Sequence, residues 1–428
     1  MQKRRERIQK RKKRADGDLS EFILLSLLKE GPLSLADLEK AMALHTVDFS
    51  RFVQHQRVNS LTVQSYCEDL TRKQLLNLNS EAKYELTQQG KASAQESEWA
   101  MEKGAAILEK QVLSPAATAR NTIIGYILLS VLKMVAGFFS GSVGLIADGA
   151  DTTVDTVASG IVWCGIKIKK EAVGTITIIV LMFCTAITLA FESVRSIIGN
   201  LEGTFVPMSM PYLVITVELI ALASAFTFSI YQRYVGRRSQ NFSLLSQSVD
   251  TKNSMYSAAA VIIGAVFSIF GIYWVDAIVG GIIAVRISID GINLTRQIIR
   301  TLKGEKPDYS QFKLPFEKVI SNRRMETYRN WVLYIVKNEK HCNRQAIVAS
   351  LEKTFRPSYM PKVFSEVAMG KDFEFSENFD QIIQPLIETC YLQETEGSYC
   401  LTESGKTYLK DLIDTAKYRR GNINQKSN

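Results

Sequence analysis

Long apolar runs follow one another through the middle of this chain of 428 residues. Each has about 20 residues or more, enough for an α-helix to cross the hydrocarbon core of a bilayer. Six such spans can be drawn, at residues 120–140, 143–166, 173–198, 210–232, 243–271 and 274–299. The flanks are charged and mixed, and they bring the whole-chain average to 46% hydrophobic and 22% charged residues. The sequence therefore predicts a mainly α membrane protein, with a six-transmembrane-helix bundle between two polar arms.

Basic residues between the spans indicate the orientation of the bundle. The segments after the first, third and fifth spans carry no Lys or Arg. The second span is followed by Lys167, Lys169 and Lys170, and the fourth by Arg233, Arg237 and Arg238. The sixth span exits into Arg296, Arg300 and Lys303. Loops rich in Lys and Arg stay on the cytoplasmic side. Both termini are therefore expected in the cytoplasm, and we expect an integral protein of the plasma (inner) membrane.

The two arms share a short sequence repeat. The residues Tyr84, Leu86, Thr87, Gly90 and Lys91 recur with the same spacing as Tyr399, Leu401, Thr402, Gly405 and Lys406. Each copy follows a pattern typical of an amphipathic helix, at residues 61–76 and 379–392. A third helix that runs into two short strands is the order of a winged-helix domain. We therefore predict cytoplasmic winged-helix-like domains over residues 18–95 and 325–415.

The rest of the chain divides around these domains. We expect the transmembrane domain at 118–303, linkers at 96–117 and 304–324, and tails at 1–17 and 416–428. The first tail holds nine basic residues and one acidic residue between Lys3 and Arg14. We expect it to be solvated, with contact to anionic lipid headgroups or nucleic acid still open. No signal peptide is predicted, because the apolar stretch at 22–28 is short.

Asp151 and Asp155 lie inside the second span, where carboxylates are unexpected. Their i, i+4 spacing places both on one face of a helix. A carboxylate in hydrocarbon is costly unless it faces a cavity, a partner or a cation. The pair is therefore a candidate functional site for something charged that crosses the membrane. The structural alternative is a buried network in which neighbouring Thr hydroxyls cap the two carboxylates.

Residues 121–161 resemble the first two membrane helices of the cation diffusion facilitator family of divalent-metal/proton antiporters. The matching residues are Asn121, Lys133, Gly137, Ser142, Ala147, Asp148, Asp151 and Asp155. The resemblance extends over residues 118 to about 303 and includes a fifth helix at Leu244 to Gly264. It implies that Asp151 and Asp155 bind metal and that Asp250 is the third ligand. Dimers are common in the family, so it also implies a homodimer.

The chain departs from the family pattern at two positions of the fifth helix. Ser254 stands where a fourth carboxylate is expected, four residues after Asp250, and Gln247 replaces an Asp that usually precedes the motif. The site then offers three carboxylates, with Ser254 or Asn253 as a neutral oxygen donor. We expect weaker affinity or a different choice of ion. A structural or vestigial role for Asp250 is the alternative.

The predicted site has only oxygen ligands, because the histidines of the chain, His45, His55 and His341, lie in the arms. Such a set suits Mn2+, Mg2+ or Fe2+ better than Zn2+, whose protein sites favour nitrogen and sulfur. We therefore favour manganese or ferrous iron as the transported ion, with zinc still open. The six cysteines have no metal-binding spacing. No permanently bound cofactor and no enzymatic activity are expected.

The same carboxylates predict coupling to protons. Two carboxylates one helical turn apart repel each other, so the pair can hold a proton when no metal is bound. Metal binding needs the deprotonated forms and expels protons. We therefore predict metal efflux in exchange for protons. Two other charged residues lie in the spans: Lys133 is expected to snorkel or to pair with an acidic residue, and Glu218 to make a polar contact or to relay protons.

A second hypothesis is a membrane-bound metal sensor or regulator with a degenerate transporter core. It is motivated by Ser254, Gln247 and the two unusual arms. Winged helices most often read DNA through the third helix, but residues 68–73 hold two acidic residues against two basic ones. A DNA-reading surface is more basic than that. For the arms we favour contact with a protein partner or dimerisation over DNA binding.

Overall fold

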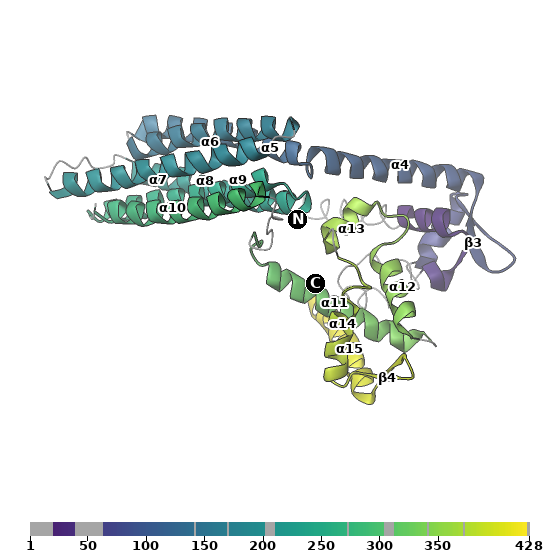
Figure 1. Ribbon diagram of the computed structural model, residues 1–428. Coiled ribbons are helices and arrows are strands. Elements are labelled where there is room, and N and C mark those ends of the chain that lie inside the picture. The colour runs from purple at the N-terminus through teal and green to yellow at the C-terminus, as the bar shows by residue number, and fades with distance from the viewer. Residues whose placement is uncertain are drawn as a thin grey trace. The chain divides into compact units, whose positions relative to one another are not determined.

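The computed structural model describes residues 20–38, 63–140, 143–168, 171–201, 210–271, 274–303, 312–339, 342–370 and 373–425. Within these ranges the chain is mainly helical (Figure 1). It divides into two compact units, one of residues 108–317 and one of residues 1–107 together with 318–428. The basic tail predicted at 1–17 and all three histidines lie outside the described residues.

Long helices make up the unit at residues 108–317. They are α5 (Pro115–Ser140), α6 (Val143–Lys167), α7 (Glu171–Leu201), α8 (Pro211–Arg238), α9 (Phe242–Ile269) and α10 (Trp274–Leu302). Side-chain caps explain where two of these helices, α5 and α9, begin. The Ser114 hydroxyl accepts a hydrogen bond from the Ala117 N–H at 3.2 Å, and the Asn241 side chain accepts one from the Leu244 N–H at 3.0 Å. Ser and Asn are favoured at this position because they satisfy N–H groups that the helix leaves free.

Four of these helices are long and apolar enough to cross a membrane. They are α5, α8, α9 and residues 172–199 of α7. Their apolar side chains remain largely exposed in the bundle, where Leu128 of α5 is 67% exposed and Phe191 of α7 is 68% exposed. Apolar surface of this extent indicates contact with lipid. Helices α6 and α10 have similar lengths, but they are not among the four.

The long helices pack so that α9 meets α6. Helix α5 packs along α6 and α8, α8 packs along α9, and α7 packs along α10. Helix α9 also contacts α6, α7 and α10. An apolar cluster joins these four helices, with Val162, Ile178, Met182, Leu245 and Ile287 among its members. Polar residues of α6 and α9 are therefore held at fixed positions beside each other.

The second unit contains two arms. In the N-terminal arm, residues 20–30, 35–38 and 63–72 are helical. Strands β1 (Leu33–Ser34), β2 (Leu76–Leu78) and β3 (Lys83–Leu86) form an antiparallel sheet in the order β1-β3-β2. Helix α4 (Gln88–Gln111) follows β3. The apolar core of this arm includes Ile23, Leu25, Leu38, Val63, Leu70 and Leu76.

The C-terminal arm has five helices and a hairpin within the described residues. The helices are α11 (Glu317–Asn338), α12 (Arg344–Phe355), α13 (Lys362–Met369), α14 (Phe379–Glu388) and α15 (Glu403–Gln425). Strands β4 (Leu392–Thr395) and β5 (Ser398–Leu401) pair antiparallel between α14 and α15. Aromatic rings fill the core, where Tyr328 packs edge-on against Phe355 and Phe375.

The sequence repeat of the arms is also a repeated structure. Thr87 Oγ1 accepts a hydrogen bond from the Gly90 N–H at 2.9 Å, and Thr402 Oγ1 accepts one from the Gly405 N–H at 3.0 Å. In each arm this threonine follows a pair of antiparallel strands and precedes a long helix. The two arms therefore share the same strand-to-helix corner, while their assignment as winged-helix domains stays a prediction.

Tyr359 joins the two arms. It lies between α12 and α13 and packs edge-on against Phe22, with the ring centroids 4.9 Å apart. It is 5% exposed and belongs to the apolar core of the N-terminal arm. An ion pair of 2.8 Å between Lys353 Nζ and Glu30 Oε2 also links the arms. A segment of the C-terminal arm thus completes the core of the N-terminal arm.

Candidate metal site

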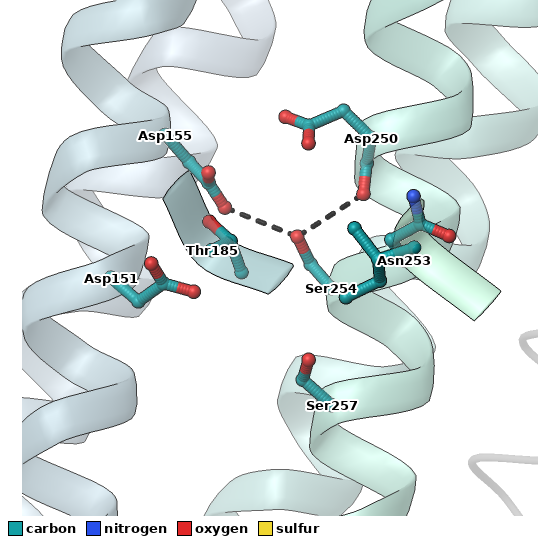
Figure 2. A pocket seen from close by; sticks show the side chains of 8 residues that line it. Asp151, Asp155, Thr185, Asp250, Asn253, Ser254 and Ser257 are labelled. Carbon is teal, nitrogen blue, oxygen red and sulfur yellow. Dashed lines mark hydrogen bonds between the residues drawn. The ribbon is translucent and has the colours of Figure 1, made fainter. Parts of the chain in front are cut away.

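A small cavity with a polar wall lies among α6, α7, α9 and α10 (Figure 2). Its wall consists of Asp151, Asp155, Thr185, Asp250, Asn253, Ser254, Ser257 and Ile287. All five residues that the sequence predicts as metal ligands are among them. The structure thus brings the predicted ligands of two separate helices to one place.

The helical repeat explains how two helices supply the carboxylates. Asp151 and Asp155 are one turn apart on α6, and Asp250 and Ser254 are one turn apart on α9. In Figure 2 the carboxylates of Asp155 and Asp250 face each other across the space between these helices. Both residues are half-buried. Together the two helices offer a concentration of negative charge that neither has alone.

Ser254 links the two sides of the cavity. Its Oγ donates a hydrogen bond to Asp155 Oδ2 at 3.1 Å and lies 3.3 Å from the carbonyl oxygen of Asp250, as Figure 2 shows. A hydroxyl has a single proton, so it donates to one of these oxygens at a time or shares the proton between them. Ser254 therefore stabilises Asp155 without adding a negative charge to the site.

The side-chain amide of Asn253 has a different role in the wall. Asn253 is 3% exposed, and neither its Oδ1 nor its Nδ2 has a hydrogen-bond partner among the described residues. A buried amide without partners is unfavourable, and buried polar groups usually find a partner, a water or an ion. Asn253 is therefore a wall residue whose amide lacks a partner, and in Figure 2 this amide points away from Asp155 and Asp250.

The carboxylates do not form a closed coordination shell in this conformation. In the part of the chain that the structure describes, no group of three or more His, Cys, Asp or Glu residues is arranged to hold a metal ion. Like charges repel strongly in a medium of low dielectric constant, which keeps carboxylates apart when no cation lies between them. Binding a metal ion would therefore require the side chains of α6 and α9 to approach one another.

Two polar residues of the wall were not predicted from the sequence. Thr185 is one of four threonines of α7, and no spacing in the sequence distinguishes it from the others. Ser257 follows Ser254 by three residues on α9, so helical periodicity could have placed it on the same face. Gln247, which replaces an expected Asp, lies outside the wall and donates from Nε2 to Ser159 Oγ at 2.5 Å.

A buried chain of hydrogen bonds fixes α9 beside the cavity. Thr251 Oγ1 lies 2.8 Å from Gln232 Oε1 on α8 and 2.6 Å from Tyr126 Oη on α5. Gln232 Nε2 in turn donates to Thr122 Oγ1 of α5 at 3.3 Å. Because Thr251 stands between Asp250 and the other wall residues of α9, this network also sets the position of the ligands.

Asp148 precedes Asp151 by three residues on α6 but lies outside the cavity wall. Its carboxylate forms an ion pair with Lys133 Nζ of α5. Of the two roles expected for Lys133, snorkelling or pairing with an acidic residue, the structure shows the pairing. Lys133 is 5% exposed, so the pair is internal to the bundle.

Residues 121–302 match the family model of the cation efflux transmembrane domain. The matched range runs from the first turns of α5 to the end of α10 and contains every residue of the cavity wall. This match, over less than half of the chain, makes the membrane domain similar to the cation efflux transmembrane domain of the cation diffusion facilitator family. The family resemblance predicted from the sequence is confirmed.

Three relatives illustrate the extent of the similarity. An uncharacterized transporter of Methanocaldococcus jannaschii, MJ0449, is 25% identical over 207 residues, which are 45% of this chain and 71% of the relative. The manganese efflux system protein MneS of Bacillus subtilis is 22% identical over 224 residues, 48% of this chain and 74% of the relative. The magnetosome protein MamB of Magnetospirillum gryphiswaldense is 23% identical over 193 residues, 42% of this chain and 64% of the relative.

Proposed function

We propose that this chain exports a divalent metal ion from the cytoplasm in exchange for protons, through the cavity between α6 and α9. Asp151, Asp155 and Asp250 supply the charged ligands, and Ser254 and Asn253 supply neutral oxygen. The observation that carries the proposal is the convergence of three carboxylates from two helices on one cavity, inside a domain of the cation efflux family.

Manganese is the ion that we favour. The polar groups of the wall are carboxylates, hydroxyls and one amide, with no imidazole or thiolate among the described wall residues. Oxygen ligands suit hard cations such as Mn2+. The relative named as a manganese efflux system protein supports this choice. Ferrous iron would take the same ligands, whereas Zn2+ should bind less well because its protein sites favour nitrogen and sulfur.

Proton exchange would follow from competition for the same carboxylates. Without a metal ion, three carboxylates around one small cavity repel each other, and a proton relieves that repulsion. A metal ion binds the deprotonated forms and so releases protons. If the cavity opens to each side of the membrane in turn, this competition converts a proton gradient into metal export.

The proposed transporter crosses the plasma membrane with all six helices from α5 to α10, and both of its termini lie in the cytoplasm. Helices α6 and α10 are 25 and 29 residues long, and they pack against helices that are long and apolar enough to cross a membrane. Basic residues lie in the last turns of α6, α8 and α10, namely Lys167, Arg237, Arg238 and Arg300. Those ends would be cytoplasmic. A homodimer in contact with membrane lipids is part of the same proposal.

The arms would be winged-helix-like domains, over residues 18–95 and 325–415, that contact protein partners. Their shared strand-to-helix corner supports this proposal. DNA binding has less support, because Lys73 at the end of the third helix is paired with Asp69 at 2.6 Å. Retention of double-stranded DNA by the full-length protein at physiological salt would contradict this proposal.

The alternative of a membrane-bound metal sensor is not favoured by the comparisons. Two of the relatives are named as a transporter and as an efflux protein. The three carboxylates of the cavity are also all present despite the serine at 254. Stoichiometric metal binding without flux would be the behaviour of a sensor.

Transport by purified full-length protein in proteoliposomes tests the proposal. Flux of Mn2+, Fe2+, Zn2+, Co2+ and Mg2+ is followed under a pH gradient, together with internal pH. The variants Asp151→Ala, Asp155→Ala and Asp250→Ala should each lose flux and Mn2+ binding, because each removes a charged ligand. Thr188→Ala is a control, since Thr188 is exposed on α7 and donates only within its own helix, to the Cys184 carbonyl. Wild-type flux from Asp155→Ala would overturn the site.

A further inference from the structure

A second group of charges lies inside the bundle, apart from the cavity. Lys133 of α5, Asp148 of α6 and Glu218 of α8 come together from three helices. Lys133 Nζ forms an ion pair with Asp148 Oδ2 and lies 3.5 Å from Glu218 Oε2. Glu218 is fully buried, and Lys133 nearly so. None of the three belongs to the cavity wall.

Glu218 is the member of this group with unsatisfied oxygens. Neither of its carboxylate oxygens has a hydrogen-bond partner among the described residues. The charged groups that interact with it are Lys133 from α5 and Asp148 from α6. Val214, which precedes Glu218 by one turn on the same face of α8, packs in an apolar cluster with Ala136, Leu145, Val217 and Ala265.

The charges of this group do not balance if both carboxyls are ionised. One ammonium against two carboxylates leaves one negative charge in a buried, apolar part of the bundle. An uncompensated charge in such a place is strongly unfavourable, and a carboxyl removes it by binding a proton. Asp148 has the closer contact with Lys133. Glu218 is therefore the carboxyl that should hold the proton.

We propose that Glu218 is a proton-binding site separate from the metal cavity, and that the protein exchanges this proton during transport. The inference rests on the proposed metal/proton exchange and adds a residue that carries a proton without binding metal. Lys133 and Asp148 are positioning residues in this scheme. While Lys133 pairs with Asp148, Glu218 stays protonated. When a divalent ion in the cavity compensates the charge of Asp148, Lys133 can turn to Glu218 and stabilise its carboxylate, and the proton leaves.

Helix α6 provides the connection between the two groups. Asp148, Asp151 and Asp155 follow at i, i+3 and i+7, so they share one side of α6. A movement of α6 that closes the carboxylates around a metal ion would also move Asp148 relative to Lys133. Proton release from Glu218 would in this way accompany metal binding.

The position of Glu218 along the bundle fits a route for protons from outside. It lies seven residues after the start of α8 at Pro211, and Asp148 lies five residues after the start of α6 at Val143. Asp155 is seven residues further along α6, a rise of about 10 Å. In the proposed topology these helix starts are at the outer face. An external proton would therefore reach Glu218 before it reached the metal cavity.

Infrared spectroscopy of the purified full-length protein tests the proton site without any need for transport. The carbonyl stretching band of a protonated carboxyl is recorded at neutral pH without metal. Glu218→Gln should lose a component of this band, because the amide that replaces the carboxyl has no such absorption. Asp148→Asn should lose the same component although Glu218 is intact, since Lys133 then has Glu218 as its single carboxylate partner. Thr188→Ala is the control and should keep it.

Two results of that experiment would overturn the inference. One is a band that is the same in the wild type and in Glu218→Gln, which would mean that Glu218 is ionised. The other is a band that persists in Asp148→Asn, which would mean that the balance of charges around Lys133 does not decide the protonation of Glu218. Both results can be observed whether or not the protein transports metal. Failure of the proton-site inference is therefore distinguishable from failure of the proposed function.

The role in transport is tested by counting protons per metal ion. In proteoliposomes, Glu218→Gln should still bind and move Mn2+, with fewer protons moved per ion and a flatter dependence of flux on pH. Asp155→Ala should lose flux altogether. A wild-type proton-to-metal ratio in Glu218→Gln would refute the inference while leaving the metal cavity in place. The inference would also be refuted if the wild type bound a second equivalent of Mn2+ and Glu218→Gln did not. The group of Lys133, Asp148 and Glu218 would then hold a metal ion instead of a proton.

Discussion

Ser254 Oγ donates a hydrogen bond to Asp155 Oδ2 at 3.1 Å, so a hydroxyl of α9 faces a carboxylate of α6 across the cavity. This is the position where the family pattern has a fourth carboxylate. The hydroxyl satisfies one oxygen of Asp155 but contributes no attraction to a cation beyond its dipole. A site with three carboxylates should hold a divalent ion less tightly than one with four, and release it more readily.

Replacing Ser254 by Asp should tighten metal binding and slow turnover. The new carboxylate would add a fourth negative charge beside Asp155. We expect Kd for Mn2+ to fall roughly tenfold or more, which corresponds to about 1.4 kcal/mol. Equilibrium binding and proteoliposome flux measure the two effects. Ser254→Ala removes the hydroxyl without adding charge and serves as the control. Binding by Ser254→Asp that is no tighter than by Ser254→Ala would show that residue 254 does not reach the ion.

The ligand-bearing faces of α6 and α9 could be predicted because helical spacing is visible in a sequence. Asp151 and Asp155, like Asp250 and Ser254, are four residues apart, and each pair lines the cavity. Thr185 could not be predicted, because its place in the wall depends on how α7 packs against the other helices. The same holds for the closeness of Lys133 to Glu218, which requires α5 and α8 to be neighbours.

Alanine at Gly90 or Gly405 should destabilise the arm that contains it. A Cβ at Gly90 would lie 1.9 Å from the Leu75 carbonyl oxygen, and one at Gly405 would lie 2.1 Å from the Tyr391 carbonyl oxygen. The backbone just before β2 or β4 must shift to admit either methyl group, at a cost of about 1–3 kcal/mol. Gly104→Ala in α4 is the matched control. Apart from its neighbours in the chain and the backbone of α4 itself, no described heavy atom lies within 4 Å of its added Cβ, so it should be neutral or stabilise α4 by up to about 1 kcal/mol.

Hydrogen exchange of the full-length protein measures the effect of each variant on each arm individually. Gly90→Ala should reduce the protection of β2 and β3, whereas Gly405→Ala should reduce that of β4 and β5. Gly104→Ala should leave all four strands as protected as in the wild type. If neither of the first two variants changes the exchange of its own strands, the shared corner does not stabilise the arms.

Tyr359→Ala should weaken the N-terminal arm although the residue belongs to the C-terminal arm. The tyrosine is buried against Phe22, and loss of a buried aromatic ring usually costs about 3–5 kcal/mol. Residues 20–30 should therefore exchange faster while β4 and β5 stay protected. Lys353→Ala is the control, because its ion pair with Glu30 has a 63% exposed lysine side chain, and such pairs contribute about 1 kcal/mol or less. Equal exchange in both variants would argue against Tyr359 as the main link.

The elements of the arms were easier to predict than their association. The repeat of Thr87 and Thr402 marks a strand-to-helix corner in each arm, and local hydrogen bonds form it. The contact between Phe22 and Tyr359 joins residues from opposite ends of the chain. No local pattern distinguishes Tyr359 from other aromatic residues in polar loops. The segment after it contains the short helix α13.

Alkaline pH should unfold the N-terminal arm through Cys67. Burial, with a smaller contribution from the neighbouring charge of Glu68, raises the pKa of the Cys67 thiol to about 12, whereas an unfolded thiol ionises near 8.5. Because the folded arm disfavours the thiolate, this group's contribution to stability is complete below about pH 8.5 and is lost as the pH rises toward 12. Near pH 10 the loss should be roughly 2 kcal/mol. Cys67→Ala should be less stable at neutral pH, because it loses packing, but its stability should fall less steeply above pH 8.5.

Alkylation followed by mass spectrometry provides an independent measurement at moderate pH. The exposed Cys390 and Cys400 should react quickly, and the buried Cys67 only after denaturation. Rapid alkylation of Cys67 in the folded protein would contradict the burial on which the alkaline transition depends.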